Sequence, residues 1–315
     1  MGSFLTPVML RTALEVGLIY AIVALSLFIS FSILNICDLS TDGCFTLGCA
    51  VGAVVTMAGH PLLAIPAAML AGVLSGAVTA LLQTKLGVPS ILAGIIVNTG
   101  LYTVNLGVMG FSSNVSIFGT DTLFSLWGKL FDGTVLGDWS RSILLLILVA
   151  LICAALNWFL KTRIGLSIRA TGDSMEMVRA SSIDPSFMIV VGLCCSNALT
   201  GLAGSLFASY NKSADINLGT GMVTIALAAL IIGETLFGKR RMPVRIVGVV
   251  IGSCLYRFMI SIALRLNAPT EAFKLASALI VAIAIAAPEA QRALALHRRK
   301  KAAMRRRRER GGKAC

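Results

Sequence analysis

The sequence predicts an all-α polytopic membrane protein of about eight to ten transmembrane helices, with a broken or re-entrant helix early in the chain. Of the 315 residues, 57% are hydrophobic, and the mean hydropathy is +0.89. Only 13% of the residues are charged, whereas a soluble domain has about 25%. Apolar runs close to the roughly 20 residues that a helix needs to cross a bilayer recur along the chain. These observations exclude a soluble globular protein.

Nine apolar segments stand out, and several of them are short for a complete crossing. They cover residues 13–34, 43–59, 62–83, 88–110, 141–160, 187–210, 219–237, 243–265 and 273–289. We take residues 1–290 as one transmembrane domain and residues 291–315 as a basic tail. The first run is too long for the apolar core of a signal peptide, so it predicts an anchored first span.

Basic residues predict which segments face the cytoplasm, because loops rich in Lys and Arg stay on that side. The polar loop 161–186, the cluster at 239–245 and the tail 291–315 are therefore placed inside. The stretch 111–140 has more Asp than Lys and is placed outside, with a short surface helix around 122–130. The N-terminus lies outside if every segment crosses and inside if one of the first two is re-entrant, and Arg11 mildly favours inside.

The basic tail follows an apolar segment and contains no aromatic residue for base stacking. We therefore expect it to fix the topology and to touch anionic membrane lipid, with a cytoplasmic C-terminus and no nucleic-acid partner.

A polar stretch interrupts the first long apolar region at residues 35–43 (NICDLSTDG). Asp, Ser, Thr, Asn and Gly prefer helix caps and turns to helix interiors. The stretch is either a break that lines a cavity inside the membrane or a loop at its surface, and we favour the break. Ser40, Thr41 or Asp42 is expected to cap the next helix, and Asp38, Ser40 and Asp42 are candidate residues of a translocation path.

A second polar break at residues 210–219 (YNKSADINLG) also precedes an apolar segment and loosely resembles the first. Matching interruptions in a transporter point to the transport path, so Asp215 and Asn217 join the candidates. Asn98 is a further candidate; together with Thr99 and Asn105 it is more typical of hydrogen bonding between helices than of substrate contact.

Two other patterns predict packing. Small residues recur four positions apart at Gly48 and Gly52, and in three later pairs at 72 and 76, 201 and 205, and 248 and 252. Such pairs let helix backbones approach closely in a membrane. Glu234 lies near Lys239 and Arg240, which predicts a local ion pair at the membrane surface.

No apparatus for catalysis is visible in the sequence, and we expect no enzyme activity, no cofactor and no metal. The two His and eight Cys form no set with metal-ligand spacing. Residues 233–240 match the phosphate-loop pattern until Arg240, where a Ser or Thr is needed to hold Mg²⁺. Nucleotide binding by this chain is therefore rejected.

Taken in order, several stretches resemble the membrane permeases of ATP-binding-cassette importers, in the branched-chain amino acid and ribose group. Residues 20–25 with 36–43 are similar to that group's first helix and its DLS…G break. Residues 165–172 with 179–184 are similar to its cytoplasmic coupling loop, and residues 199–206 with 231–234 to its late core helices. Residues 91–110 resemble a branch often linked to amino acids. The resemblance covers most of residues 15–290.

The resemblance implies two cytosolic ATPase subunits, a second permease copy or paralogue, and an extracytoplasmic solute-binding protein as partners. It implies a multi-pass protein of the bacterial inner membrane that translocates a small polar solute, for which we expect an amino acid before a sugar or nucleoside. The ATPase-coupling residues would be Gly165, Arg169, Ala170, Gly172, Arg179 and Asp184. A stand-alone secondary carrier or channel is the alternative, but carriers usually pair their intramembrane carboxylates with basic residues.

Overall fold

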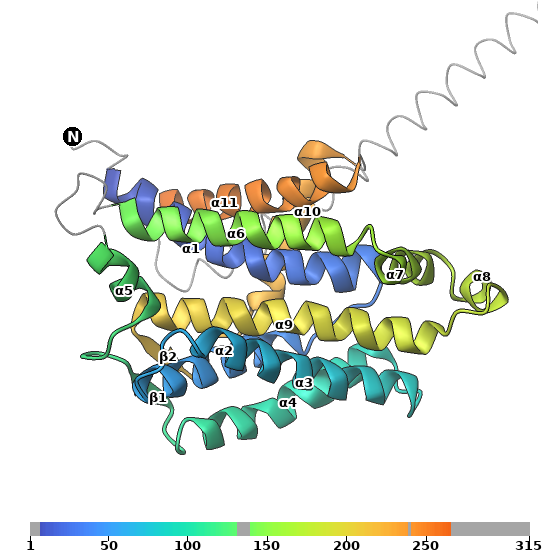
Figure 1. Ribbon diagram of the computed structural model, residues 1–315, viewed down its shortest axis with the longest axis horizontal. Coiled ribbons are helices and arrows are strands. Elements are labelled where there is room, and N and C mark those ends of the chain that lie inside the picture. The colour runs from blue at the N-terminus through green and yellow to red at the C-terminus, as the bar shows by residue number, and fades with distance from the viewer. Residues whose placement is uncertain (1–6, 131–138, 239–240, 266–315) are drawn as a thin grey trace, which may run out of the picture.

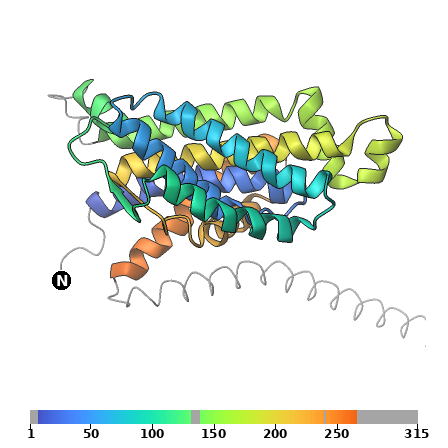
Figure 2. The ribbon, with the colours of Figure 1, turned by 90° about the horizontal axis from the view of Figure 1, so that it is seen from below.

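The computed structural model describes residues 7–130, 139–238 and 241–265, which form a bundle of long helices (Figures 1 and 2). Six helices of this described part are long and apolar enough to cross a membrane. They are α1 (Pro7–Leu27) with its continuation as the π-helix η1 (Phe28–Ile33), α3 (Ala64–Thr84), α4 (Ser90–Val108), α6 (Ser140–Phe159), α9 (Pro185–Asn211) and α11 (Met242–Arg265). The all-α polytopic fold is confirmed. The segment 273–289 and the tail 291–315 lie outside the described residues.

Two apolar helices are shorter than a full crossing, namely α2 (Thr41–Met57) and α10 (Met222–Phe237). Each follows one of the two polar breaks. Residues 34–40, which follow η1, are non-helical, and Asn35 among them lies in the left-handed region at φ 58°. Residues 212–221, which follow α9, are also non-helical. The breaks thus turn two crossings into a non-helical part and a short helix, as expected from their Asp, Ser, Asn and Gly content.

The two ends of the bundle carry different small elements (Figure 1). At one end, β1 (Asn114–Ser116) pairs antiparallel with β2 (Ser213–Asp215), beside α5 (Leu123–Leu130). The predicted short helix around 122–130 is thereby confirmed. At the other end lie α7 (Arg163–Asp173) and α8 (Met175–Ala180). We call the end with β1 and β2 the ladder end and the end with α7 and α8 the docking end.

Helix α1 starts at the ladder end. Glu15 of α1 accepts hydrogen bonds there from Ser142 at the start of α6 and from Tyr210 at the end of α9. At the docking end, Gly172 of α7 packs on the carbonyl of Ile33 in η1. The first crossing therefore starts at the opposite end of the bundle from the docking loop and ends beside that loop. Arg11 lies 3.4 Å from the buried Glu15, so its charge is compensated and it is a weak signal of topology.

Helix α9 runs through the middle of the bundle and packs on α2 and α3 through the predicted small residues (Figures 1 and 2). A Cβ added to Gly48 would come within 2.2 Å of the Gly201 carbonyl, and one on Gly52 within 2.5 Å of the Ser205 hydroxyl. Gly72 meets the Asn197 carbonyl in the same way. Backbone contact of this kind is what small-residue pairs provide in membranes, and the prediction is confirmed.

Glu234 forms an ion pair within the described part of the chain. The predicted partners, residues 239 and 240, lie outside the described ranges, and Arg245 at the start of α11 contacts the Glu234 carboxylate at 2.5 Å. Ser32 of η1 donates a hydrogen bond to the same carboxylate, and Arg245 also lies over the Phe28 ring. Gly238 (φ 67°) ends α10, so the chain turns back and brings α11 beside it.

Candidate substrate cavity and docking surface

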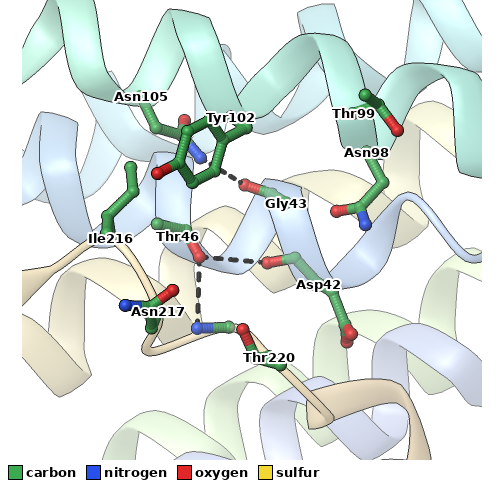
Figure 3. Close-up of a pocket in the computed structure, with 11 residues that line it drawn as sticks. Asp42, Gly43, Thr46, Asn98, Thr99, Tyr102, Asn105, Ile216, Asn217 and Thr220 are labelled. Atoms are coloured by element: carbon green, nitrogen blue, oxygen red, sulfur yellow. Dashed lines mark hydrogen bonds between the residues drawn. The ribbon is translucent and has the colours of Figure 1, made fainter.

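A polar cavity of about 290 Å³ lies where the two broken crossings meet (Figure 3). We call it the junction cavity. The start of α2, the second half of α4 and the chain that follows β2 form its walls. Its lining residues are Asp42, Gly43, Thr46, Asn98, Thr99, Tyr102, Asn105, Ile216, Asn217, Gly219 and Thr220. One carboxylate is the single charged group among them, and most of the others carry a hydroxyl or an amide.

Asp42 joins the two breaks. Its carboxylate accepts hydrogen bonds from the backbone N–H groups of Gly221 (3.0 Å) and Val223 (2.8 Å), at the start of α10. A carboxylate is favourable there because the first N–H groups of a helix have no intrahelical partner and carry partial positive charge. The expectation that a side chain of residues 40–42 caps α2 was wrong, because Ser40 at its N-cap makes no such bond and Asp42 caps a distant helix instead.

The contact between the breaks extends along α2. The Thr46 hydroxyl accepts a hydrogen bond from the Gly219 N–H (3.1 Å) and donates one to the Asp42 carbonyl (Figure 3). A Cβ on Gly219 would lie 2.0 Å from that carbonyl, so the second break approaches α2 too closely for any side chain there. The two short helices therefore start at one common point.

Asp38 and Ser40 lie outside the cavity lining. Asp38 is 1% exposed and accepts three hydrogen bonds, from the N–H and hydroxyl of Ser40 and from the side-chain amide of Asn197. Asn197 sits about half way along α9. The first break is thus inside the bundle, and the alternative of a surface loop does not hold for it.

The polar residues of α4 divide between packing and cavity. Asn105 is 1% exposed and donates a hydrogen bond to the Gly43 carbonyl at 3.1 Å, which is the predicted contact between helices. Thr99 bonds only within α4, to the Ile95 carbonyl. Asn98 faces the cavity beside Gly43 and makes no hydrogen bond within the described part of the chain.

The second break places its two candidates differently. Asn217 is exposed and lines the cavity, whereas the Asp215 carboxylate accepts a hydrogen bond from the Asn217 N–H and is not part of the lining. Three polar lining residues were not named from the sequence at all: Thr46, Tyr102 and Thr220. Two of them follow a candidate by one helical turn, at Asp42 plus four and Asn98 plus four, so helical spacing could have found them.

The six candidate coupling residues also fall into groups. Gly165 packs on the backbone of Phe159 and Leu160 at the end of α6, and Gly172 packs on η1, so both seat α7 on the bundle. Asp184 caps α9 through the Ser186 N–H. Ala170 and Arg179 are exposed and Arg169 is half-buried.

Exposed apolar side chains accompany these residues on α7 and α8. Leu166 is 52% exposed and Met177 is 72% exposed. Thr162 and Ser174 cap the two helices through the N–H groups of Gly165 and Met177. A capped two-helix unit with an open surface of apolar and basic groups is suited to binding a soluble protein. We call α7 and α8 the docking unit.

Comparison with known proteins places the whole bundle in one family. The family described as branched-chain amino acid transport system, permease component, matches residues 9–287. A tyrosine transport system permease protein of Clostridioides difficile is 33% identical over 84% of this chain and 86% of its own length. The ribose import permease of Escherichia coli K12 is 30% identical over 70% and 67%. An autoinducer 2 import permease of Yersinia pestis is 27% identical over 71% and 60%.

No solved structure matches the chain. Within the described residues, no three His, Cys, Asp or Glu side chains gather in a way that could hold a metal ion.

Proposed function

This chain belongs to the branched-chain amino acid transport permease family, and we propose that it carries an amino acid through the junction cavity of an ATP-binding-cassette importer. The membrane would be the bacterial inner membrane, with the docking unit and the C-terminus on the cytoplasmic side. The observation that carries the proposal is the meeting of two broken crossings at a polar cavity. Broken helices and matched interruptions of this kind surround substrate sites in other transporters.

The chemistry of the junction cavity favours an amino acid. The Asp42 carboxylate attracts an ammonium group, since no cationic side chain lines the cavity to compensate it. The amides of Asn98 and Asn217 and the hydroxyls of Tyr102 and Thr220 can donate hydrogen bonds to a carboxylate. The relative from Clostridioides difficile carries the name of a tyrosine transporter, in agreement with this choice. A sugar is the second candidate, because ribose permeases are also among the relatives.

Transport driven by ATP requires a surface on which an ATPase subunit acts. The exposed residues Ala170, Arg179 and Met177 of the docking unit would make this contact. Arginine suits it because its planar guanidinium can bind carboxylates and carbonyls of a partner with two parallel hydrogen bonds. The partner set would be two ATPase subunits, a second permease chain and an extracytoplasmic solute-binding protein.

The first test measures uptake. The full chain is reconstituted in vesicles with a candidate ABC ATPase and a candidate solute-binding protein from the same organism, and ATP-dependent uptake of labelled amino acids and of ribose is compared. We expect uptake of an amino acid and at least a roughly tenfold loss in Asp42→Asn, which keeps an acceptor for α10 but removes the charge. Uptake of ribose alone would overturn the substrate assignment, and uptake indifferent to Asp42→Asn would overturn the role of the cavity.

The second test measures docking. The double charge reversal Arg169→Glu/Arg179→Glu is compared with Lys85→Glu, which reverses an exposed charge in the turn between α3 and α4 at the same end. We expect co-purification of the ATPase to be lost in the first variant and kept in the second. An ATPase that binds both variants equally would overturn the role of the docking unit, and one that binds neither the variants nor the wild type would favour a stand-alone carrier.

A further inference from the structure

An apolar groove of about 360 Å³ opens on the side of the bundle, far from the junction cavity. We call it the lateral groove. Its lining comes from the second half of α6, from Leu151 to Phe159, and from the middle of α9, from Cys195 to Leu202. Met69 of α3 and Ile29 of η1 complete the lining. The groove exists because α6 packs mainly on α1 and leaves a gap towards α9.

The lining of the lateral groove excludes a polar ligand. Every lining side chain is apolar, and its most polar atom is the Cys195 sulfur. In the membrane such a surface is covered either by another helix or by a lipid chain.

The dimensions favour a lipid chain. From Leu151 to Phe159 the α6 wall rises about 12 Å, which is close to the roughly 15 Å of hydrocarbon in one leaflet. The length therefore matches one unbranched acyl chain, and the apolar lining suits its hydrocarbon.

The docking end of the groove adds the charges that a phospholipid headgroup needs. Phe159 lines that end, and its carbonyl accepts a hydrogen bond from Thr162. Lys161 and Arg163 follow directly, are exposed, and form no ion pair within the part of the chain that the structure describes. Basic groups beside a helix gap at the membrane surface bind anionic headgroups. Trp158 is 72% exposed on the same turn, as is typical of the interface.

We propose that the lateral groove binds one anionic phospholipid of the leaflet at the docking end, with an acyl chain between α6 and α9 and its phosphate at Lys161 and Arg163. The site is separate from the transport path. Because the acyl chain would lie on η1, which contacts α7, the lipid would fill the gap next to the docking unit.

The test uses photoreactive lipid. The full chain is reconstituted in phosphatidylethanolamine and phosphatidylcholine vesicles with a trace of phosphatidylglycerol that carries a diazirine in the middle of one acyl chain. Adducts are mapped by mass spectrometry of peptides, and the same chain on phosphatidylcholine is the headgroup control. We expect adducts concentrated on residues 151–159 and 195–202, compared with the exposed face of α4 at Ile95 and Ile96.

One matched pair of variants and one double variant separate a site from ordinary lipid contact. Ala155 lines the groove and Ala154 is exposed next to it without lining it, so Ala155→Trp should remove the groove adducts while Ala154→Trp keeps them. Lys161→Gln/Arg163→Gln should lower the phosphatidylglycerol adducts roughly tenfold and leave phosphatidylcholine adducts unchanged. Adducts spread evenly over all exposed helices, equal for both lipids, or insensitive to Ala155→Trp would overturn the proposal, as would a cross-link between two copies at residues 151–159.

Discussion

The two broken crossings, residues 34–57 and 212–237, are held in different ways. In the first, Asp38 and Ser40 are at most 1% exposed, and three hydrogen bonds fix the carboxylate to its own turn and to α9. In the second, Asn217 and Thr220 are exposed, and α10 depends for its cap on Asp42 of the first crossing. From this comparison we predict that the first break is a fixed support and that the second, with its exposed side chains, is the more easily displaced of the two.

The largest effect is expected at the first break, for Asp38→Ala. The change leaves three buried donors without their acceptor, each at about 1–3 kcal/mol, so the free energy of unfolding should fall by at least about 3 kcal/mol. Thermal unfolding of the detergent-purified protein measures it. Asp38→Asn is the matched control, because its amide can bond to the Asn197 side-chain oxygen, which has no partner in the described structure. An alanine variant as stable as the wild type would refute the fixed support.

A smaller effect is expected for Asp42→Ala, which removes the cap of α10. Loss of a capping carboxylate costs about 1 kcal/mol, so the protein should fold. The fractional loss of uptake should be much larger than the fractional loss of the free energy of unfolding. The reason is that the second break loses its hydrogen bonds to the Asp42 carboxylate. Equal losses in Asp38→Ala and Asp42→Ala, measured by the same unfolding assay, would remove the difference between the two breaks.

Asn217→Ala tests the exposed side of the second break. The side chain is open to the cavity, so the free energy of unfolding should change by less than about 0.5 kcal/mol. Uptake should nevertheless fall, whereas Asn211→Ala, an exposed amide at the end of α9 and outside the cavity, should transport normally. Normal uptake by Asn217→Ala would place substrate contact elsewhere.

The smallest effect concerns Asp121, in the loop between β1 and α5. Hydrogen bonds from Lys129 (2.8 and 2.9 Å) and from Ser125 hold the pKa of this exposed carboxyl below its ordinary value. A lowered pKa in the folded state stabilises the loop at pH values above the ordinary pKa of about 3.9, and the contribution is lost as pH falls through the lowered value. In Lys129→Ala the pKa should return towards the ordinary value, as measured by ¹³C NMR titration. An unchanged pKa would contradict the pairing.

The sequence predicted the helices and breaks of this fold well. It predicted poorly which residues of different elements contact one another. All eight predicted apolar segments that lie within the described residues are helices, and both breaks fall where Asp, Ser, Asn and Gly accumulate. The cap that Asp42 provides to α10 was missed because its partners are about 180 residues away, and local preferences describe only a residue's own helix. The partner of Glu234 was missed for a related reason, since the turn at Gly238 brings Arg245 closer than chain distance suggests.

The seating of the docking unit has a mechanical meaning. At Gly165 and Gly172 the main chain of α7 rests directly on the main chains of α6 and η1, with no layer of side chains between them. Side chains can change rotamer and absorb a small displacement, whereas backbones in contact are nearly incompressible. We therefore expect a displacement of α7 to be transmitted to η1 and to the turn that leads into Asp38. A single added methyl group at Gly172 would clash with the backbone of η1 and would separate α7 from it.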